Sequence, residues 1–174
     1  ELSIDAENKE QQKWYVYKEM SLVKGHLEGV VNTLDKNKKR IKRTSFLQGI
    51  PSGVYESFDE NGRVIEEGLF AEDGELQEKT VYWQDPSLEK KVFQRLVFKD
   101  KEHFFVEVFN KEGVLVESYD LLEGKKHGDA VVYWPTHGGL VAQEGLYVSG
   151  KRHGEWKKFS SQGSLLGKQE YLYG

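Results

Sequence analysis

The sequence predicts an all-β fold: an elongated, curved, single antiparallel β-meander built of about six stacked β-hairpins. The first reason is a repeated glycine frame, because Gly-Lys-Lys-His-Gly at 124–128 returns as Gly-Lys-Arg-His-Gly at 150–154, and Gly-x-x-x-Gly also occurs at 25–29 and 49–53. The second is that short runs rich in Val, Tyr, Phe and Leu lie between turn sequences such as Asp-Glu-Asn-Gly. The third is composition, since 37% apolar against 31% charged residues suits a single layer better than a thick core.

The elements follow in chain order. Residues 1–21 are a polar lead-in that includes a first strand-like run at 14–17, and residues 22–174 form the repeat array. Its units start near residues 25, 49, 74, 100, 124 and 150. In the last unit we predict a turn at the glycine frame 150–154, a strand over 155–159, a turn over 160–163 and a strand over 164–171. Glycines at the turn ends supply positive φ at no steric cost.

Large side chains recur at two places in each unit. The residues that end the first strand are Leu34, Phe58, Trp83, Phe109, Tyr133 and Phe159, and those before the next glycine are Phe46, Phe70, Phe98, Leu121, Tyr147 and Tyr171. The units near 74 and 100 are degenerate, because the first has Glu78 in place of the second glycine and the second has lost both glycines. Strand alternation places aromatic residues on both faces, and we expect one face to curl over a narrow aromatic core.

The best-preserved unit resembles a MORN repeat of the bacterial type. Tyr147, the frame 150–154, Trp156, Phe159, Gly163 and Leu165 match its pattern of Tyr-x-x-Gly-Lys-x-x-Gly-x-Trp-x-x-Tyr/Phe-x-x-x-Gly-x-Leu. The resemblance extends over about residues 22–174 and is weakest near residue 100. It implies stacked hairpins with a groove and a binding or scaffolding role, and many such proteins are labelled YwqK-family antitoxins. It implies no particular substrate, and it transfers no functional residue.

Several function classes are disfavoured by the sequence. A net charge of −4 with mixed signs argues against nucleic-acid binding, and the absence of cysteine removes disulfides and thiolate metal sites. His127 and His153 occupy equivalent positions in neighbouring units, about 10 Å apart, too far to share one metal ion. No nucleophile motif or placed carboxylate pair is present. We therefore predict a protein that is not an enzyme, with no catalytic residues, cofactor or metal.

The predicted function is non-catalytic protein–protein interaction through the groove of the sheet. Tyr55, Tyr82 and Trp156 are the proposed partner-binding anchors, since exposed aromatic side chains contribute much of the binding energy of interfaces. A sharper version, an antitoxin or immunity protein, rests on the family resemblance alone.

The alternative is a membrane-surface or envelope-associated module that binds anionic lipid or glycan. Its site would be a basic patch of exposed turns formed by Lys125, Lys126, Lys151 and Arg152, although charged turns also serve simply to keep a protein soluble. An uncovered terminal strand near 169–173 offers an edge for self-association. The compartment stays open, because a chain that starts at Glu1 leads us to expect an upstream segment that has been removed, and a cysteine-free chain suits the cytosol and exported compartments alike.

Overall fold

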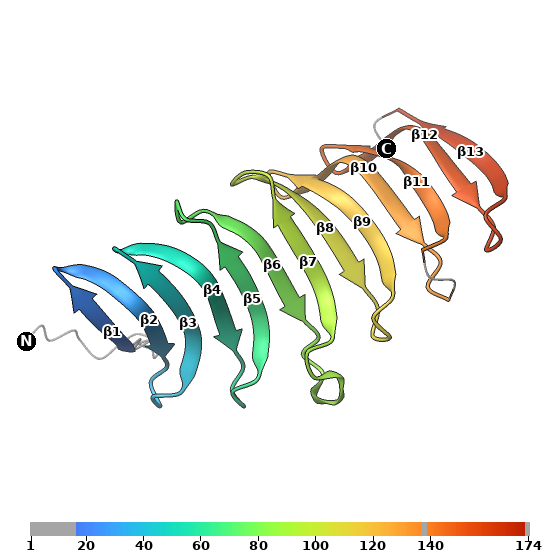
Figure 1. Ribbon diagram of the computed structural model, residues 1–174. Helices are drawn as coiled ribbons and strands as arrows, with labels where there is room; N and C mark the ends of the chain where they lie inside the picture. Colours follow the sequence, from blue (N-terminus) through green and yellow to red (C-terminus); the bar gives the residue numbers. More distant parts are fainter. Residues whose placement is uncertain (1–16, 137–138, 173–174) are drawn as a thin grey trace, which may run out of the picture.

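A computed structural model of the chain describes residues 17–136 and 139–172. These residues form one open antiparallel sheet of thirteen strands, in which each strand pairs with its neighbours in chain order (Figure 1). The strands are β1 (Tyr17–Val23), β2 (His26–Leu34), β3 (Arg40–Leu47), β4 (Ile50–Phe58), β5 (Val64–Phe70), β6 (Leu76–Tyr82), β7 (Val92–Phe98), β8 (His103–Phe109), β9 (Leu115–Leu122), β10 (Lys125–Tyr133), β11 (Val141–Val148), β12 (Lys151–Phe159) and β13 (Leu165–Tyr171). One 3-10 turn, η1 (Pro86–Leu88), interrupts the β6–β7 connection. The predicted all-β meander of stacked hairpins is confirmed.

The described residues contain no helix long and apolar enough to cross a membrane. The first strand begins at Tyr17, and the rest of the strand-like run predicted at 14–17 lies outside the described residues.

The glycine frame contains a shorter turn than predicted. In the last unit, Ser149 and Gly150 both have positive φ, +50° and +86°, and Lys151 already pairs with Val148. Gly154 lies inside β12, at a register shift between β11 and β12, with φ +66°. Residues 151–153 therefore belong to the strand, and the prediction of a turn across the whole frame is wrong. The reason is that a two-residue turn with two positive φ angles matches the twist of the strands, while the second glycine serves a β-bulge.

The β2–β3, β4–β5, β8–β9 and β12–β13 connections are short turns held by polar side chains. Asp59 is typical: its Oδ1 accepts hydrogen bonds from the backbone N–H groups of Asn61 and Arg63, both at 2.9 Å. These backbone hydrogen bonds hold the pKa of the Asp59 carboxyl below its usual value. Two edges result, which we call the glycine edge (connections β1–β2, β3–β4, β5–β6, β7–β8, β9–β10 and β11–β12) and the loop edge (the remaining connections).

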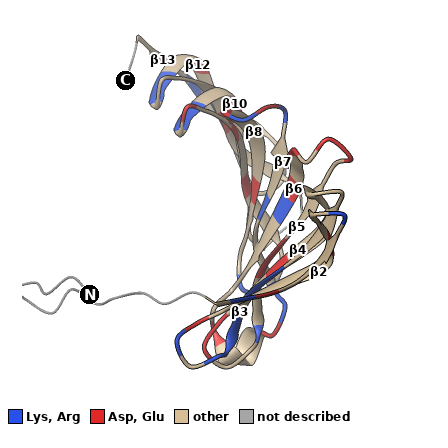
Figure 2. Ribbon diagram, turned by 90° about the vertical axis from the view of Figure 1, so that its left-hand side faces the viewer, with Lys and Arg blue, Asp and Glu red and all other residues tan. Residues whose placement is uncertain are grey.

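One face of the sheet, here called the aromatic face, carries the main core. Its middle row runs across twelve adjacent strands as Val31, Thr44, Tyr55, Gly68, Lys79, Leu96, Val106, Tyr119, Ala130, Gly145, Trp156 and Gln169. Val106 is fully buried and Ala130 is 2% exposed, although no second layer lies over them in the described sheet. Figure 2 shows that the sheet bends into an arc. Because side chains converge on the inside of a bend, this burial places the aromatic face on the inner side of the arc.

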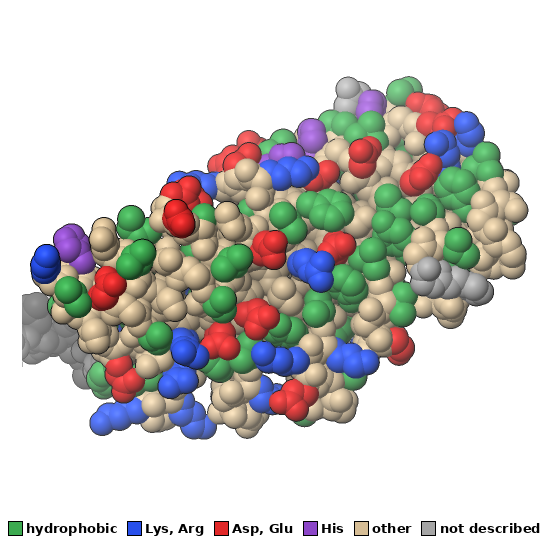
Figure 3. All heavy atoms as spheres, in the orientation of Figure 1, with side chains coloured by type: hydrophobic (Ala, Val, Ile, Leu, Met, Phe, Trp, Pro, Cys, Tyr) green, Lys and Arg blue, Asp and Glu red, His purple; other side chains and the backbone are tan. Residues whose placement is uncertain are grey.

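The opposite face, here called the charged face, carries a row of mostly polar side chains. This row is Asn32, Arg43, Glu56, Glu67, Thr80, Arg95, Glu107, Ser118, Val131, Glu144, Lys157 and Lys168. Cross-strand ion pairs occur along it, including Arg95–Glu107 at 3.1 Å and Lys157–Glu144 at 3.0 Å. Figure 3 shows one side of the molecule on which acidic and basic side chains are interspersed along the sheet, as expected for this face.

Near the loop edge, the charged face also carries a row of large side chains. The row is Leu34, Phe58, Tyr82, Phe109, Tyr133 and Phe159, each placed opposite the start of the next strand. The prediction of Trp83 as the third member is wrong by one residue, because Tyr82 pairs with Val92 as Phe58 pairs with Val64. The longer β6–β7 connection hides this register in the sequence. Aromatic residues on both faces were predicted and are observed.

Candidate functional site

The three predicted aromatic anchors do not form an exposed surface. Tyr55 is 3% exposed, Tyr82 is 7% exposed and Trp156 is 4% exposed. Tyr55 and Trp156 lie on the aromatic face and Tyr82 on the charged face, so the expectation that they share an open groove is wrong. Each of the three side chains is packed among neighbouring side chains of its own face. Sequence alternation indicated two faces, but it could not indicate how closely neighbouring side chains would cover each ring.

The buried tyrosines hold their hydroxyl groups on carboxylates. The Tyr55 hydroxyl donates to Glu66 Oε1 at 2.8 Å, and Glu66 also pairs with Lys79 at 3.5 Å. Burial, and then the hydrogen bond to Glu66, raises the pKa of Tyr55 well above its usual value of 10.0. Tyr82 donates in the same way to Glu67, and burial is again the first cause of its raised pKa. These contacts are structural, since they lie within the sheet.

The four predicted basic residues do not form one patch. They are strand residues and not turn residues, so their side chains alternate between the faces. Lys126 and Arg152 lie on the aromatic face. Lys125 and Lys151 lie on the charged face, at the glycine edge. The predicted single anionic-ligand patch is therefore absent, because the turns before these residues are only two residues long.

On the aromatic face of β9–β13, the side chains of Lys126 and Arg152 lie over aromatic rings. The Lys126 Nζ lies 4.0 Å from the ring centre of Tyr119 and 5.4 Å from that of Tyr147, and it pairs with Glu117. Contacts of a cation with a ring face at such distances contribute about 0.5–1 kcal/mol at exposed sites and more when desolvated. This contact is one that sequence reasoning missed, although the spacing of large residues before each glycine was its visible signal.

Arg152 is held more firmly. Its guanidinium lies 4.0 Å from the ring centre of Trp156 and 5.6 Å from that of Tyr171. It donates to Gln143 Oε1 and to the Tyr171 hydroxyl, both at 3.3 Å. A hollow of about 520 Å³ opens here, lined by Arg152, Trp156, Gln143, Gln169 and Tyr171 together with residues 157–158 of β12 and 166–168 of β13. The hollow gathers aromatic, cationic and amide groups in one place, which is the composition of a binding surface.

Trp156 itself is fixed from several directions. Its indole Nε1 donates to the Leu146 carbonyl oxygen at 3.1 Å, and the Tyr147 ring packs edge-on at 5.2 Å between centres. A Cβ on Gly145 would lie 2.4 Å from Trp156 Cδ2, so glycine is needed for the indole to lie flat on β11. Trp156 is the floor of the hollow, and the side chains around it form the accessible part.

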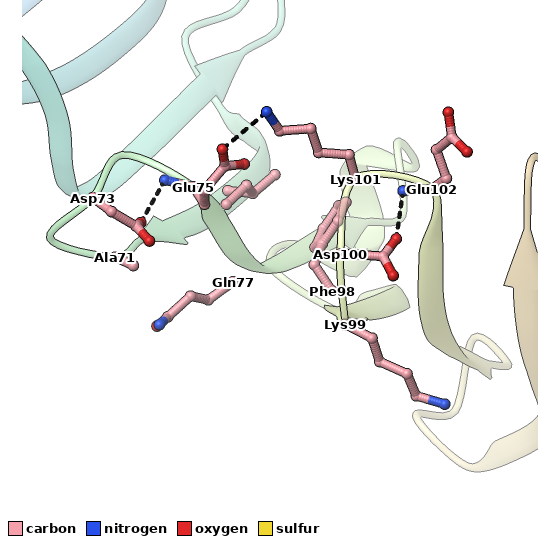
Figure 4. Close-up of a pocket in the computed structure, with 10 residues that line it drawn as sticks. Ala71, Asp73, Glu75, Gln77, Phe98, Lys99, Asp100, Lys101 and Glu102 are labelled. Carbon is pink, nitrogen blue, oxygen red and sulfur yellow. Dashed lines mark hydrogen bonds and ion pairs between the residues drawn. The ribbon is translucent and has the colours of Figure 1, made fainter.

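A second opening lies at the glycine edge where the units are degenerate. It has a volume of about 890 Å³ and lies between the β5–β6 and β7–β8 turns. Figure 4 shows its lining, in which the Phe98 ring lies beside Asp100 and the Lys101 side chain reaches toward Glu75. The opening arises in the two degenerate units, where both turns are longer than the two-residue turns at the other glycine-edge connections.

The contacts between successive turns explain this opening. At other places on the glycine edge, backbone bonds join one turn to the next, such as Glu123 N–H to Glu102 O at 2.9 Å and Gly150 N–H to Lys126 O at 2.8 Å. Within the described residues no such bond joins the β5–β6 turn to the β3–β4 turn or to the β7–β8 turn. An ion pair between Lys101 and Glu75 spans them at 3.0 Å, with both side chains mostly exposed. Surface pairs of this kind stabilise by about 0–1 kcal/mol, so this point of the edge is weakly joined.

The carboxylates of this opening already serve the turns. Asp73 accepts from the Glu75 N–H at 2.9 Å, and Asp100 accepts from the N–H groups of Glu102 and His103 at 2.9 and 2.8 Å. Backbone hydrogen bonds lower the pKa of Asp100 below its usual value. The part of the chain that the structure describes contains no group of three or more His, Asp and Glu residues arranged to hold a metal ion.

His127 has a contact of its own at this edge. Its Nδ1 lies 3.5 Å from the Ser149 N–H, so this ring stands against the turn of the following unit.

Comparisons with known proteins add no family. No family model and no curated protein matches the sequence. Among solved structures, the chain is similar to TarM, with 18% identity and a TM-score of 0.43 over 64% of this chain and 20% of that one. A mutant of Staphylococcus aureus TarM in complex with fondaparinux, α-GlcNAc-glycerol and UDP gives 20% identity and a TM-score of 0.41 over 57% of this chain and 19% of that one.

A protein of unknown function from Bacteroides fragilis gives 12% identity and a TM-score of 0.20, over 91% of this chain and 94% of that one. The chain thus spans about a fifth of the length of the TarM chains. Because these TM-scores are below 0.5, the fold assignment stands on the strand pairing alone.

Proposed function

We propose that the protein is a non-catalytic binding module that holds a protein partner on the aromatic face of strands β9–β13. The observation that carries this proposal is the hollow beside Trp156, where Arg152, Tyr171 and Gln143 form one accessible surface. Arginine, tyrosine and tryptophan are enriched among the few residues that contribute most of the binding energy of protein interfaces. The anchors are thus the side chains that surround the buried Trp156 and not the three aromatic residues proposed from the sequence.

A steric block of the aromatic face tests this proposal without assuming any chemistry of the partner. Gly167 lies on that face in β13, and a Cβ placed on it meets no atom within 4 Å. Gly167→Trp should fill the hollow while the sheet folds normally. Leu165→Trp is the matched control, because Leu165 lies in the same strand, is 50% exposed, pairs with Phe159 of the charged face and does not line the hollow.

The assay is partner capture from a lysate of the source organism, followed by a binding titration with the purified partner. We expect Gly167→Trp to abolish binding of that partner and Leu165→Trp to leave it unchanged. Equal binding by both variants would refute the aromatic face as the site. Retention on anionic vesicles that falls steeply with salt, and that Gly167→Trp leaves intact, would instead support the membrane-surface alternative.

The antitoxin version of this proposal rests on the family resemblance. It requires a toxin encoded beside this protein, whose expression kills cells only when this protein is deleted. A toxin that is still neutralised by Gly167→Trp would separate the antitoxin role from the aromatic face.

A further inference from the structure

Arg152 has an unusual environment for an arginine at a protein surface. Its guanidinium is stacked on Trp156 and has neutral hydrogen-bond partners, which are Gln143 and the hydroxyl groups of Tyr147 and Tyr171. No carboxylate of the described residues lies within ion-pair distance of it, whereas Lys126 on the same face pairs with Glu117. The guanidinium carries five N–H donors in a planar fork that suits a carboxylate. Arg152 is thus positioned and still has donors to offer.

The charges of the surrounding strands are sorted by face. On the aromatic face, β10–β13 carry three cations, Lys126, Arg152 and Lys158, and no acidic residue. The acidic residues of these four strands, which are Asp129, Glu144, Glu155 and Glu170, all lie on the charged face. Lys158 is exposed and forms no ion pair with the described residues. Such a one-sided surface attracts a negatively charged partner.

Comparison of the repeat units shows that positive charge at the position of Arg152 occurs only in the last two units that keep the frame. The residue two places after the first glycine of the frame points onto the aromatic face in each unit that keeps the frame. It is Leu27 in the first unit and Pro51 in the second, but Lys126 and Arg152 in the last two. The structural role of the position therefore does not require a cation, and the two cations stand only where the hollow lies.

The spacing of the cations along β12 suits an extended chain. Arg152 and Lys158 flank Trp156 on one face of the strand, about 15–20 Å apart at about 3.3 Å per residue. Gln143 and Gln169 beside them provide amide donors and acceptors, which match a peptide backbone. An extended segment with acidic residues at alternate positions presents its carboxylates on one side and reaches both cations.

We propose that the aromatic face of β10–β13 binds an extended acidic peptide segment of a partner protein, with one carboxylate on the fork of Arg152 and another on Lys158. This inference rests on the proposed function and specifies the chemistry of the partner.

The test compares two labelled ten-residue peptides by fluorescence anisotropy, (Glu-Thr)5 and its neutral counterpart (Gln-Thr)5. We expect the acidic peptide to bind at least about tenfold more tightly, since a hydrogen bond in which both groups are charged is shorter and stronger than one to a neutral amide. Arg152→Gln and Lys158→Gln should each remove most of this preference. Lys151→Gln is the matched control, because it removes the same charge from an exposed residue of the same strand on the opposite face.

Arg152→Gln could disturb the packing on Trp156, so Lys158→Gln provides a second test. Lys158 is exposed, and its substitution should leave the fold intact. Equal affinity for both peptides, no binding of either up to about 1 mM, or an equal loss with Lys151→Gln would overturn the inference. If Gly167→Trp blocks the natural partner while (Glu-Thr)5 does not bind, the binding face stands and the acidic chemistry fails. If Gly167→Trp still binds the natural partner, the partner titration itself refutes the proposed binding face, whatever the peptides do.

Discussion

Gly145→Ala should destabilise the protein through a single added methyl group. The new Cβ would lie 2.4, 2.5 and 2.6 Å from Cδ2, Cε2 and Cγ of Trp156, distances that real Cβ contacts do not show. The indole cannot move away freely, because its Nε1 bonds to the Leu146 oxygen and Arg152 covers its ring. Overpacking of this kind costs about 1–3 kcal/mol.

The backbone effect of this change has the opposite sign. Gly145 does not have positive φ, so alanine there reduces the entropy of the unfolded chain and stabilises by about 0.4–1 kcal/mol. The cost of the clash exceeds this gain, and the net loss should lower the Tm by roughly 2–10 °C for a chain of this size. Gly167→Ala is the matched control, since Gly167 lies on the same face with open space around it. We expect it to be neutral or slightly stabilising.

Thermal and urea unfolding, followed by circular dichroism, measure both variants. A second measurement is Gly145→Ala in a Trp156→Leu background, where the smaller side chain leaves room and the penalty should shrink by about 1 kcal/mol or more, which is the cost of overpacking. Equal Tm values for Gly145→Ala and Gly167→Ala, or a penalty unchanged without the indole, would refute the packing of Trp156 on Gly145.

Three further predictions follow from the same sheet. Gly68→Ala should also destabilise by about 1–3 kcal/mol, because its Cβ would lie 2.4 Å from Tyr55 Cε1, and unfolding at the wild-type Tm would contradict this. The raised pKa of Tyr55 favours its neutral form in the folded state, so its contribution to stability is complete below pH 10 and falls as the pH rises above it. Between pH 9 and pH 11, the free energy of unfolding measured with urea should therefore fall less for Tyr55→Phe than for wild type. An equal fall in both proteins would contradict a raised pKa of Tyr55 in the folded state. Arg95→Gln should cost less than about 1 kcal/mol, since the Arg95–Glu107 pair is partly exposed, and the cost should fall further in 1 M salt.

The sequence was most informative where local rules act. Glycines with positive φ, Asx turns and alternating strands each depend on a few neighbouring residues, so the thirteen-strand meander could be predicted from the repeat. The degenerate units were also visible in the sequence, and the structure places a cavity between their turns. The length of the turn in the glycine frame was not visible, because the same five residues suit a long turn or a short turn followed by a bulge.

The length of this turn explains why the predicted basic patch is not observed. A two-residue turn makes residues 125–126 and 151–152 strand residues, so the four cations divide between the faces. Likewise, alternation assigns Tyr55 and Trp156 to a face but does not show that Gly68 and Gly145 lie opposite them on the neighbouring strands. Cross-strand register connects residues that are distant in the chain, and no local pattern contains it.

The sequence by itself determined the order of the strands, their antiparallel pairing and the repeat, because hairpins join neighbours through short connections whose residues set the geometry. Only the tertiary structure decided which aromatic rings are buried, which cations stack on them and where acidic residues are absent. Those properties depend on the bend of the whole sheet, which brings side chains of non-adjacent residues together on its inner face.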